Sequence, residues 1–163
     1  MLSLSKRADY ALLALSHLAA AQAADPARLV NAKEIAEQYE IPAELLAKLL
    51  QTLARSGIVA SQPGPTGGYR LSRPPAAVSV AEILAVIDGP LAILPCSNGH
   101  GDSCKQFSRC TIRDPLAEIE LRVKALLGQI TLADVSGAGQ PPAEWPPFPN
   151  FSGRRFAAGL PVG

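Results

Sequence analysis

Residues 40–72 read EIPAELLAKLLQTLARSGIVASQPGPTGGYRLS, and this stretch decides which fold the chain adopts. Pro42 suits a first helical position, and Gly57 is placed to end a helix in the left-handed conformation. Between them, leucines recur at helical spacing and form one broad apolar face: Leu45, Leu46, Leu49, Leu50 and Leu53. The opposite side of this predicted helix faces solvent and carries Glu44, Ala47, Lys48, Gln51 and Arg55.

A shorter helix is predicted just before it, over NAKEIAEQYE at residues 31–40, where Asn31 and Glu34 form a capping-box pattern. Two helices joined by a tight connection, the second with small and polar residues outside, are typical of a helix-turn-helix. The segment after them has two strand-like runs around a Pro/Gly turn, which predicts a β-hairpin. A hairpin in this position is a wing, and Arg70 and Arg73 lie where a wing meets phosphates.

The first residues predict another amphipathic helix, with Ser5 as its N-cap. Its apolar face consists of Ala8, Leu12, Leu15 and Ala19. Ser16 and His17 interrupt the apolar run and Asp9 follows the basic pair, so the segment does not read as a secretory signal, and we expect a cytoplasmic protein. A further helix is predicted over SVAEILAVIDGP, residues 79–90, which completes a winged helix-turn-helix DNA-binding domain over residues 1–90.

Near the end of the chain, Asp114 and Pro115 are predicted to open a helix over residues 114–135 with a cap and a first-turn proline. Apolar residues step by three and four along it: Leu116, Ile119, Val123, Leu126 and Ile130. This spacing fits a core helix or a short heptad seam, and we favour a dimerisation helix because the winged domain already has its core. A homodimer also matches a palindromic operator. Residues 136–163 are rich in Pro and Gly and are predicted to form a disordered tail.

Composition sets limits on the function of the 163-residue chain. A net charge of +1 gives no global basic signature, but DNA binding depends on a local face rather than on the sum. No run of about 18 apolar residues is present, so no membrane span is expected. The sequence contains no Ser/His/Asp set, phosphate loop or pair of carboxylates arranged for catalysis, so we do not expect an enzyme.

All three cysteines lie in CSNGHGDSCKQFSRC, residues 96–110, inside a predicted cysteine loop over residues 91–113. Unpaired cysteines are usually buried among apolar neighbours, whereas these stand among polar residues, which indicates a metal or redox role. Zinc sites usually show closer cysteine pairs, and wider gaps through a Gly-rich loop suit an iron–sulfur cluster. A cluster commonly takes four ligands, so a fourth is needed from His100, from Asp9 or His17 of a partner subunit, or from elsewhere.

Together these features resemble the IscR/NsrR/RirA family of winged-helix regulators. The resemblance runs from about residue 1 to residue 135 and rests on LSKRADYALLALSHLA, GPTGGYRLS, SVAEILAVIDGP, the cysteine triad and TLADV. It implies a homodimeric transcription factor, a repressor among its possible roles, that binds a [2Fe–2S] or [4Fe–4S] cluster and responds to iron, cluster supply, oxidants or nitric oxide.

The resemblance also implies particular ligands. Cys96, Cys104 and Cys110 match the three ligand cysteines, and Asp9 stands where one branch of the family takes its fourth ligand from the partner subunit. In another branch a histidine completes the site, but here that position holds Arg113, whose guanidinium does not bind metal. The resemblance therefore favours a three-cysteine site completed by Asp9 across the dimer, or by an exogenous thiol or water. A runner-up interpretation keeps the DNA-binding scaffold and uses the cysteines as a thiol redox switch or a zinc site.

For DNA, the resemblance implies that Lys6 and Arg7 grip phosphates at the start of the first helix. Glu44, Lys48 and Gln51 are the expected base-facing residues, because these side chains pair with cytosine, guanine and adenine respectively. Arg55 extends the same face. Many family members carry a wing arginine just before the glycine turn, but here that residue is Pro63, which leaves Arg70 or Arg73 as replacements.

Overall fold

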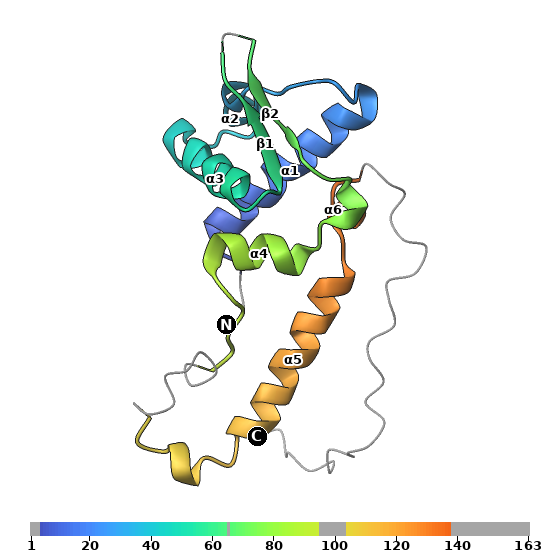
Figure 1. The fold of residues 1–163 in the computed structure, drawn as a ribbon. Helices are drawn as coiled ribbons and strands as arrows, with labels where there is room; N and C mark the ends of the chain where they lie inside the picture. Colours follow the sequence, from blue (N-terminus) through green and yellow to red (C-terminus); the bar gives the residue numbers. More distant parts are fainter. Residues whose placement is uncertain (1–3, 65, 95–103, 138–163) are drawn as a thin grey trace, which may run out of the picture.

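The computed structural model describes residues 4–64, 66–94 and 104–137 of the chain. These residues form a mainly helical structure with one small antiparallel hairpin (Figure 1). The hairpin lies at one end of the molecule, and the segment around Phe107 lies at the other (Figure 1). The elements are α1 (Lys6–Ala24), α2 (Ala32–Gln38), α3 (Ala43–Arg55), β1 (Val59–Gln62), β2 (Gly68–Leu71), η1 (Pro75–Ala77), α4 (Val80–Asp88), η4 (Phe107–Arg109), α5 (Arg113–Gln129) and α6 (Leu132–Val135).

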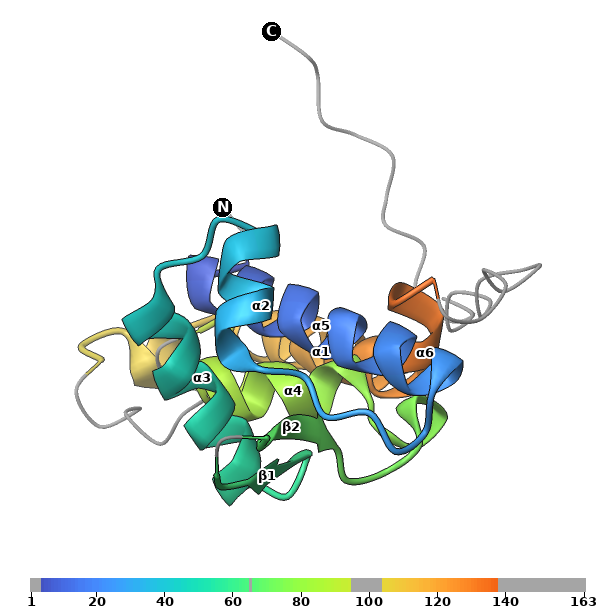
Figure 2. The same cartoon turned by 90° about the horizontal axis from the view of Figure 1, so that it is seen from above.

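Helix α1 is the central helix of the winged body and begins as predicted. The Ser5 hydroxyl oxygen accepts a hydrogen bond from the Ala8 N–H at 3.0 Å, which satisfies one of the free amides of the first turn. Its buried residues are mostly small, which lets neighbouring elements pack close to its backbone: Ala8, Ala11, Ala14, Leu15, Leu18, Ala19 and Ala21. Seen from above, α1 lies between α2 on one side and α4 on the other (Figure 2).

Helices α2 and α3 form the predicted helix-turn-helix, with two differences in detail. Asn31 caps α2 by accepting from the Lys33 N–H at 2.9 Å, but Glu34 does not complete the capping box, because its carboxylate binds Arg28 at 2.7 Å. Pro42 is the N-cap residue of α3 rather than its first helical residue. The connecting turn contains Glu40 at φ 53°, a left-handed conformation that a residue with a Cβ adopts at a cost.

The wing is the antiparallel pair β1–β2, in which Val59 faces Leu71 and Gln62 faces Gly68. A third segment, which the sequence did not reveal, joins its edge: Val30 and Tyr69 exchange two backbone hydrogen bonds, of 3.0 and 2.9 Å. This approach requires Gly68, since a Cβ there would lie 2.7 Å from the Val30 carbonyl oxygen. The base of the wing is attached to α1, because the Leu71 N–H donates to Gln22 Oε1 at 2.6 Å.

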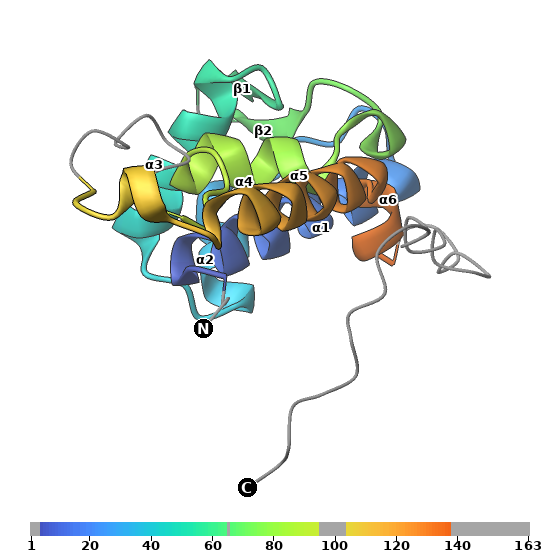
Figure 3. The ribbon, with the colours of Figure 1, turned by 90° about the horizontal axis from the view of Figure 1, so that it is seen from below.

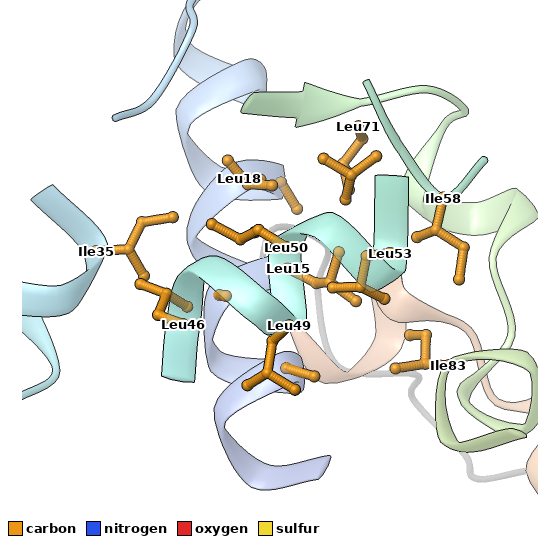
Figure 4. Packing of buried hydrophobic residues seen from close by; sticks show 14 of the residues in the cluster. Leu15, Leu18, Ile35, Leu46, Leu49, Leu50, Leu53, Ile58, Leu71 and Ile83 are labelled. Atoms are coloured by element: carbon orange, nitrogen blue, oxygen red, sulfur yellow. The ribbon is translucent and has the colours of Figure 1, made fainter. Parts of the chain in front are cut away.

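The hydrophobic core lies between α1, α3, α4 and the inner face of the wing. Leu50 and Leu53 of α3 point toward Leu15 and Leu18 of α1, and Leu71 closes the core from the hairpin (Figure 4). Of the five leucines predicted for the apolar face of α3, Leu45 is half-buried and the other four are buried. The core therefore forms on the leucine face predicted from residues 40–72.

Helix α4 begins at Ser79, whose hydroxyl accepts from the Glu82 N–H at 3.1 Å, and ends at Gly89 with φ 88°. Here too the second half of the predicted capping box is absent. Glu82 binds the guanidinium of Arg73 at 2.6 Å instead of returning to the N-cap backbone. In both failed boxes a long basic side chain from outside the helix takes the carboxylate.

The predicted helix over residues 114–135 is two helices. Helix α5 begins at Arg113, follows Ile112 without a side-chain cap, and holds Asp114 in its first turn, so the prediction that Asp114 caps it is wrong. It ends at Gln129, because Ile130 is extended and its carbonyl accepts from the Val80 N–H at 2.8 Å. Thr131 then starts α6 with a complete capping box to Asp134. Packing beside α4 thus interrupts a helical pattern that continues in the sequence.

Helix α5 extends away from the winged body, with its C-terminal end nearest α4 (Figure 1), and seen from below it runs in front of α4 (Figure 3). None of its apolar residues is buried: Leu116, Val123 and Leu126 are half-buried, and Ile119 and Leu121 are exposed. Within the described ranges, no helix is both long and apolar enough to cross a membrane.

Candidate functional site

The outer face of α3 presents the predicted base-reading residues to solvent. Glu44, Lys48 and Gln51 are exposed, and Arg55 extends this face at the last turn of the helix. None of the four has an ion pair or side-chain hydrogen bond among the described residues. An exposed helix with uncommitted polar side chains, held rigidly by a leucine core behind it, has the form of a recognition helix.

The two wing arginines differ in their surroundings. Arg70 is exposed on β2, opposite Ala60 in the hairpin register. Arg73 lies beyond the strand, where its guanidinium donates to the Glu82 carboxylate at 2.6 Å and to the Ala77 carbonyl at 3.4 Å. A guanidinium already engaged by a carboxylate loses that pair if it turns to a phosphate, so Arg70 is the more available of the two arginines.

The N-terminus of α1 carries the second predicted phosphate-binding pair. Lys6 is 81% exposed, and its ammonium lies 3.7 Å from the carboxylate of Asp9, which is also open to solvent. Arg7 is exposed beside it. Such an exposed pair contributes little to stability, so both Lys6 and Asp9 are available to other partners.

Two of the three cysteines lie in the described part of the chain. Cys104 is exposed and Cys110 is half-buried, and both are free thiols. A single turn separates them: the Phe107 N–H donates to the Cys104 carbonyl at 3.0 Å, and η4 follows. Cys96 and His100 lie outside the described residues, and no three His, Cys, Asp or Glu side chains converge elsewhere in those that are described. The donor chemistry nevertheless fits an iron–sulfur cluster, since accessible thiols in polar surroundings are free to bind soft metals.

Arg113 closes the cysteine loop at the start of α5. Its guanidinium lies 4.9 Å from the centre of the Phe107 ring, a cation–π contact. Its Nε also donates to Asp114 at 2.7 Å, and this hydrogen bond lowers the pKa of the Asp114 carboxyl. Arg113 therefore links the start of α5 to the turn at Phe107 in the cysteine loop.

His17 does not lie among the candidate ligands. Its Nε2 is 3.3 Å from Glu34 Oε1, and its ring meets Tyr39 edge-on with centroids 5.7 Å apart. The side chain is only 12% exposed, between α1 and α2. Its contacts are those of a structural residue that joins the first two helices.

One buried polar residue was missed by the sequence reasoning. Glu120 lies on α5 and accepts from the backbone N–H of Ile93 at 2.9 Å and from Lys124 at 2.7 Å. In the sequence it forms an ordinary i,i+4 pair with Lys124, and such pairs are usually exposed, so no signal marked it out.

Comparison with known proteins agrees with this architecture. A putative regulator of Rhodobacter capsulatus, named rrf2-like, is 35% identical over 86% of this chain and 97% of its own length. The solved structure of CymR, titled the global cysteine regulator of B. subtilis, covers 83% of this chain and 97% of its own, with a TM-score of 0.63 and 26% identity. The structure of T. potens IscR covers 82% and 85%, with a TM-score of 0.62 and 26% identity.

The helix-turn-helix, the wing and the exposed face of α3 define the class of the protein as a winged-helix transcriptional regulator that binds DNA. Residues 4–138 match the Rrf2 family, described as iron-dependent transcriptional regulators, and the chain belongs to this family. The family resemblance expected from the wing and the cysteine triad is confirmed.

Proposed function

We propose that the protein is a cytoplasmic, homodimeric regulator that senses iron, cluster supply or oxidative and nitrosative stress through an iron–sulfur cluster. Cys96, Cys104 and Cys110 are the proposed thiolate ligands. The observation that carries the proposal is the state of Cys104 and Cys110, two free and accessible thiols on a polar turn that leads directly into α5. When bound, the cluster supplies a centre whose assembly and loss depend on iron and oxidants.

The dimer is proposed on the burial of α5. Its apolar seam has no buried member among the described residues, and Ile119 on this seam is 38% exposed. A second α5 packed against this face removes that apolar surface from water. In such a dimer Asp9, exposed near the start of α1, is the proposed fourth ligand from the partner subunit. A carboxylate is a poor match for a soft metal centre and is therefore the ligand most easily lost.

For DNA, α3 is proposed to read base edges with Glu44, Lys48 and Gln51, and Arg55 to extend the contact. Lys6, Arg7 and Arg70 are the proposed phosphate ligands, because all three are exposed. Arg73 is left out of this set since Glu82 already holds it. Substituting Lys48 by Ala is expected to weaken operator binding by about 1–3 kcal/mol without changing the metal content. Lys33→Ala is the control: this residue lies on α2 and is paired with Glu37, and its substitution is expected to change operator affinity least.

A thiol switch or a zinc site on the same scaffold is the second candidate. The observation in its favour is again the accessible Cys104 thiol. The two functions differ in what the cysteines hold. A cluster adds iron and inorganic sulfide to the mass, whereas a disulfide removes two hydrogens and zinc adds one metal ion.

Native mass spectrometry of the anaerobically purified protein, with its absorption spectrum, tests the proposal directly. A dimer that carries the mass of a two-iron or four-iron cluster is the expected result, and Cys104→Ala is expected to lose that mass while remaining a folded dimer. Asp9→Ala tests the cross-subunit ligand. A dimer that stays free of iron after reconstitution, or binds only zinc, would move the function to the second candidate.

A further inference from the structure

Glu120 is buried in a helix whose apolar residues are not. It is 5% exposed, and it is the one charged side chain that is buried among the described residues. The apolar residues of α5 are all less buried than Glu120: they range from half-buried Leu116 to exposed Leu121. Removing a carboxylate from water is costly unless hydrogen bonds replace the lost hydration, so its partners at this place need an explanation.

Those partners connect α5 to the segment that leads into the cysteines. Glu120 Oε2 accepts from the Ile93 N–H at 2.9 Å, and Oε1 accepts from the Lys124 ammonium at 2.7 Å. Ile93 stands three residues before Cys96 in the sequence. Within the described part of the chain, the bond to Glu120 is the single hydrogen bond made by residues 90–94. The backbone there has no helix or strand to hold it, so Glu120 sets its position.

The other end of the same connection is attached to α1. Asp88, the last residue of α4, accepts from the Ser5 hydroxyl at 2.6 Å, and Ser5 is also the N-cap of α1. The connection from α4 to the cysteines is thus attached at residue 88 to the start of α1 and at residue 93 to α5. Lys6 and Arg7 follow Ser5 directly.

Helix α5 contains an internal comparison. Glu118 and Arg122 form the same i,i+4 ion pair as Glu120 and Lys124, with a distance of 2.8 Å, but Glu118 is 56% exposed. The exposed pair is equivalent to many surface pairs of small effect. What distinguishes Glu120 is burial together with a bond to backbone outside its own helix.

We propose that Glu120 is a positioning residue: it holds the backbone at Ile93, three residues before Cys96 in the sequence, against α5. The inference rests on the proposed function for its final step, because it is the cluster site that needs the cysteines in register. Its structural step, the Glu120–Ile93 attachment, does not depend on any metal. The Lys124 ammonium, 2.7 Å from Oε1, places a positive charge beside the buried carboxylate.

The structural step is tested on the full-length protein without metal, by amide hydrogen exchange at Ile93. Glu120→Ala is expected to speed exchange of this amide by about tenfold or more, because its acceptor is gone. Glu120→Gln keeps an acceptor oxygen and is expected to have a smaller effect. Glu118→Ala, the matched control, is expected to leave the rate within about twofold of wild type. An Ile93 amide that exchanges equally fast in wild type and Glu120→Ala would overturn the proposal.

The functional step is tested by alkylation of Cys96 in the same metal-free proteins and by iron release to EDTA after anaerobic reconstitution. Glu120→Ala is expected to change the rate of Cys96 alkylation relative to that of Cys104 and to release iron several-fold faster than wild type. Glu120→Gln is expected to show smaller changes in both rates, and Glu118→Ala is expected to match wild type. Circular dichroism confirms that each variant is folded. Unchanged alkylation and release in Glu120→Ala would overturn the positioning role. If wild type takes up no iron, the proposed cluster fails, while the exchange and alkylation results still decide whether Glu120 positions Cys96.

Discussion

Helices α1 and α5 have similar lengths, 19 and 17 residues, but differ in what they bury. Helix α1 buries seven apolar residues within its own chain, whereas α5 buries only Glu120. A helix in water depends on burial of its apolar face more than on its propensity, so α5 lacks the stabilisation that α1 has. The comparison teaches that the winged body forms its own apolar core, whereas the apolar residues of α5 stay half-buried or exposed in the described part of the chain.

The largest expected effect tests the core of the winged body. Leu50→Ala removes a fully buried side chain and is expected to lower the free energy of unfolding by about 2–5 kcal/mol, through lost burial and the cavity left behind. Leu121→Ala, on the exposed face of α5, is the control, and it is expected to change the stability of the winged body by less than about 0.5 kcal/mol. Urea unfolding followed by circular dichroism measures both. Equal losses would contradict the division between the two regions.

Two glycines, one in the wing and one in α5, allow the winged body and α5 to be compared at the level of the backbone. Gly68→Ala places a Cβ 2.7 Å from the Val30 carbonyl oxygen and is expected to cost about 1–3 kcal/mol, because the bridge between Val30 and Tyr69 must open. Gly128→Ala on α5 meets no atom within 4 Å, and alanine is the better helix former, so it is expected to stabilise by up to about 1 kcal/mol. Thermal unfolding of both variants checks that the two changes in stability have opposite signs. If Gly68→Ala leaves stability unchanged, the wing is not held by close contact with Val30.

Glu40 in the helix-turn-helix connection allows a stabilising change. Its φ of 53° is strained for a residue with a side chain, and Glu40→Gly is expected to raise the free energy of unfolding by about 0.5–1 kcal/mol. Glu37→Gly, inside α2, is the matched control and is expected to destabilise by a similar amount. Denaturant midpoints at constant slope distinguish the two. Loss of stability in both variants would mean that the turn conformation is not strained.

The smallest expected effect is a pH dependence at α6. Hydrogen bonds from the Thr131 backbone N–H and hydroxyl lower the pKa of Asp134 from its ordinary 3.8. A lowered folded-state pKa means that the cap stabilises α6 above about pH 4 and that this contribution is lost as pH falls through the folded value. Amide exchange of α6 measured between pH 5 and 3 checks this. In Asp134→Asn the dependence is expected to be absent.

Local patterns were sufficient to predict much of the winged body. The leucine spacing of α3, the Ser5 cap of α1 and the left-handed Gly57 are properties of a few neighbouring residues, and all three are as predicted. The reason is that apolar periodicity and short-range hydrogen bonds act over one or two turns. The exposed face of α3 follows from the same periodicity, so Glu44, Lys48 and Gln51 were also correctly placed on the surface.

Local patterns failed where a distant group competed. Glu34 and Glu82 have the sequence positions of capping-box residues, but Arg28 and Arg73 take their carboxylates. A charged hydrogen bond is stronger than the bond to a neutral amide, and the arginines come near only when the chain folds. The break at Ile130 has the same origin, since it depends on the Val80 amide of α4.

The sequence by itself determined the winged helix-turn-helix, the exposed polar face of α3 and the presence of accessible thiols, because these follow from spacing along one segment. Only the tertiary structure decided which carboxylate of α5 is buried. Glu118 and Glu120 have the same i,i+4 pattern, and the approach of Ile93 to one of them separates a surface pair from the attachment of the cysteine loop. That approach joins residues 27 positions apart, and no local pattern encodes it.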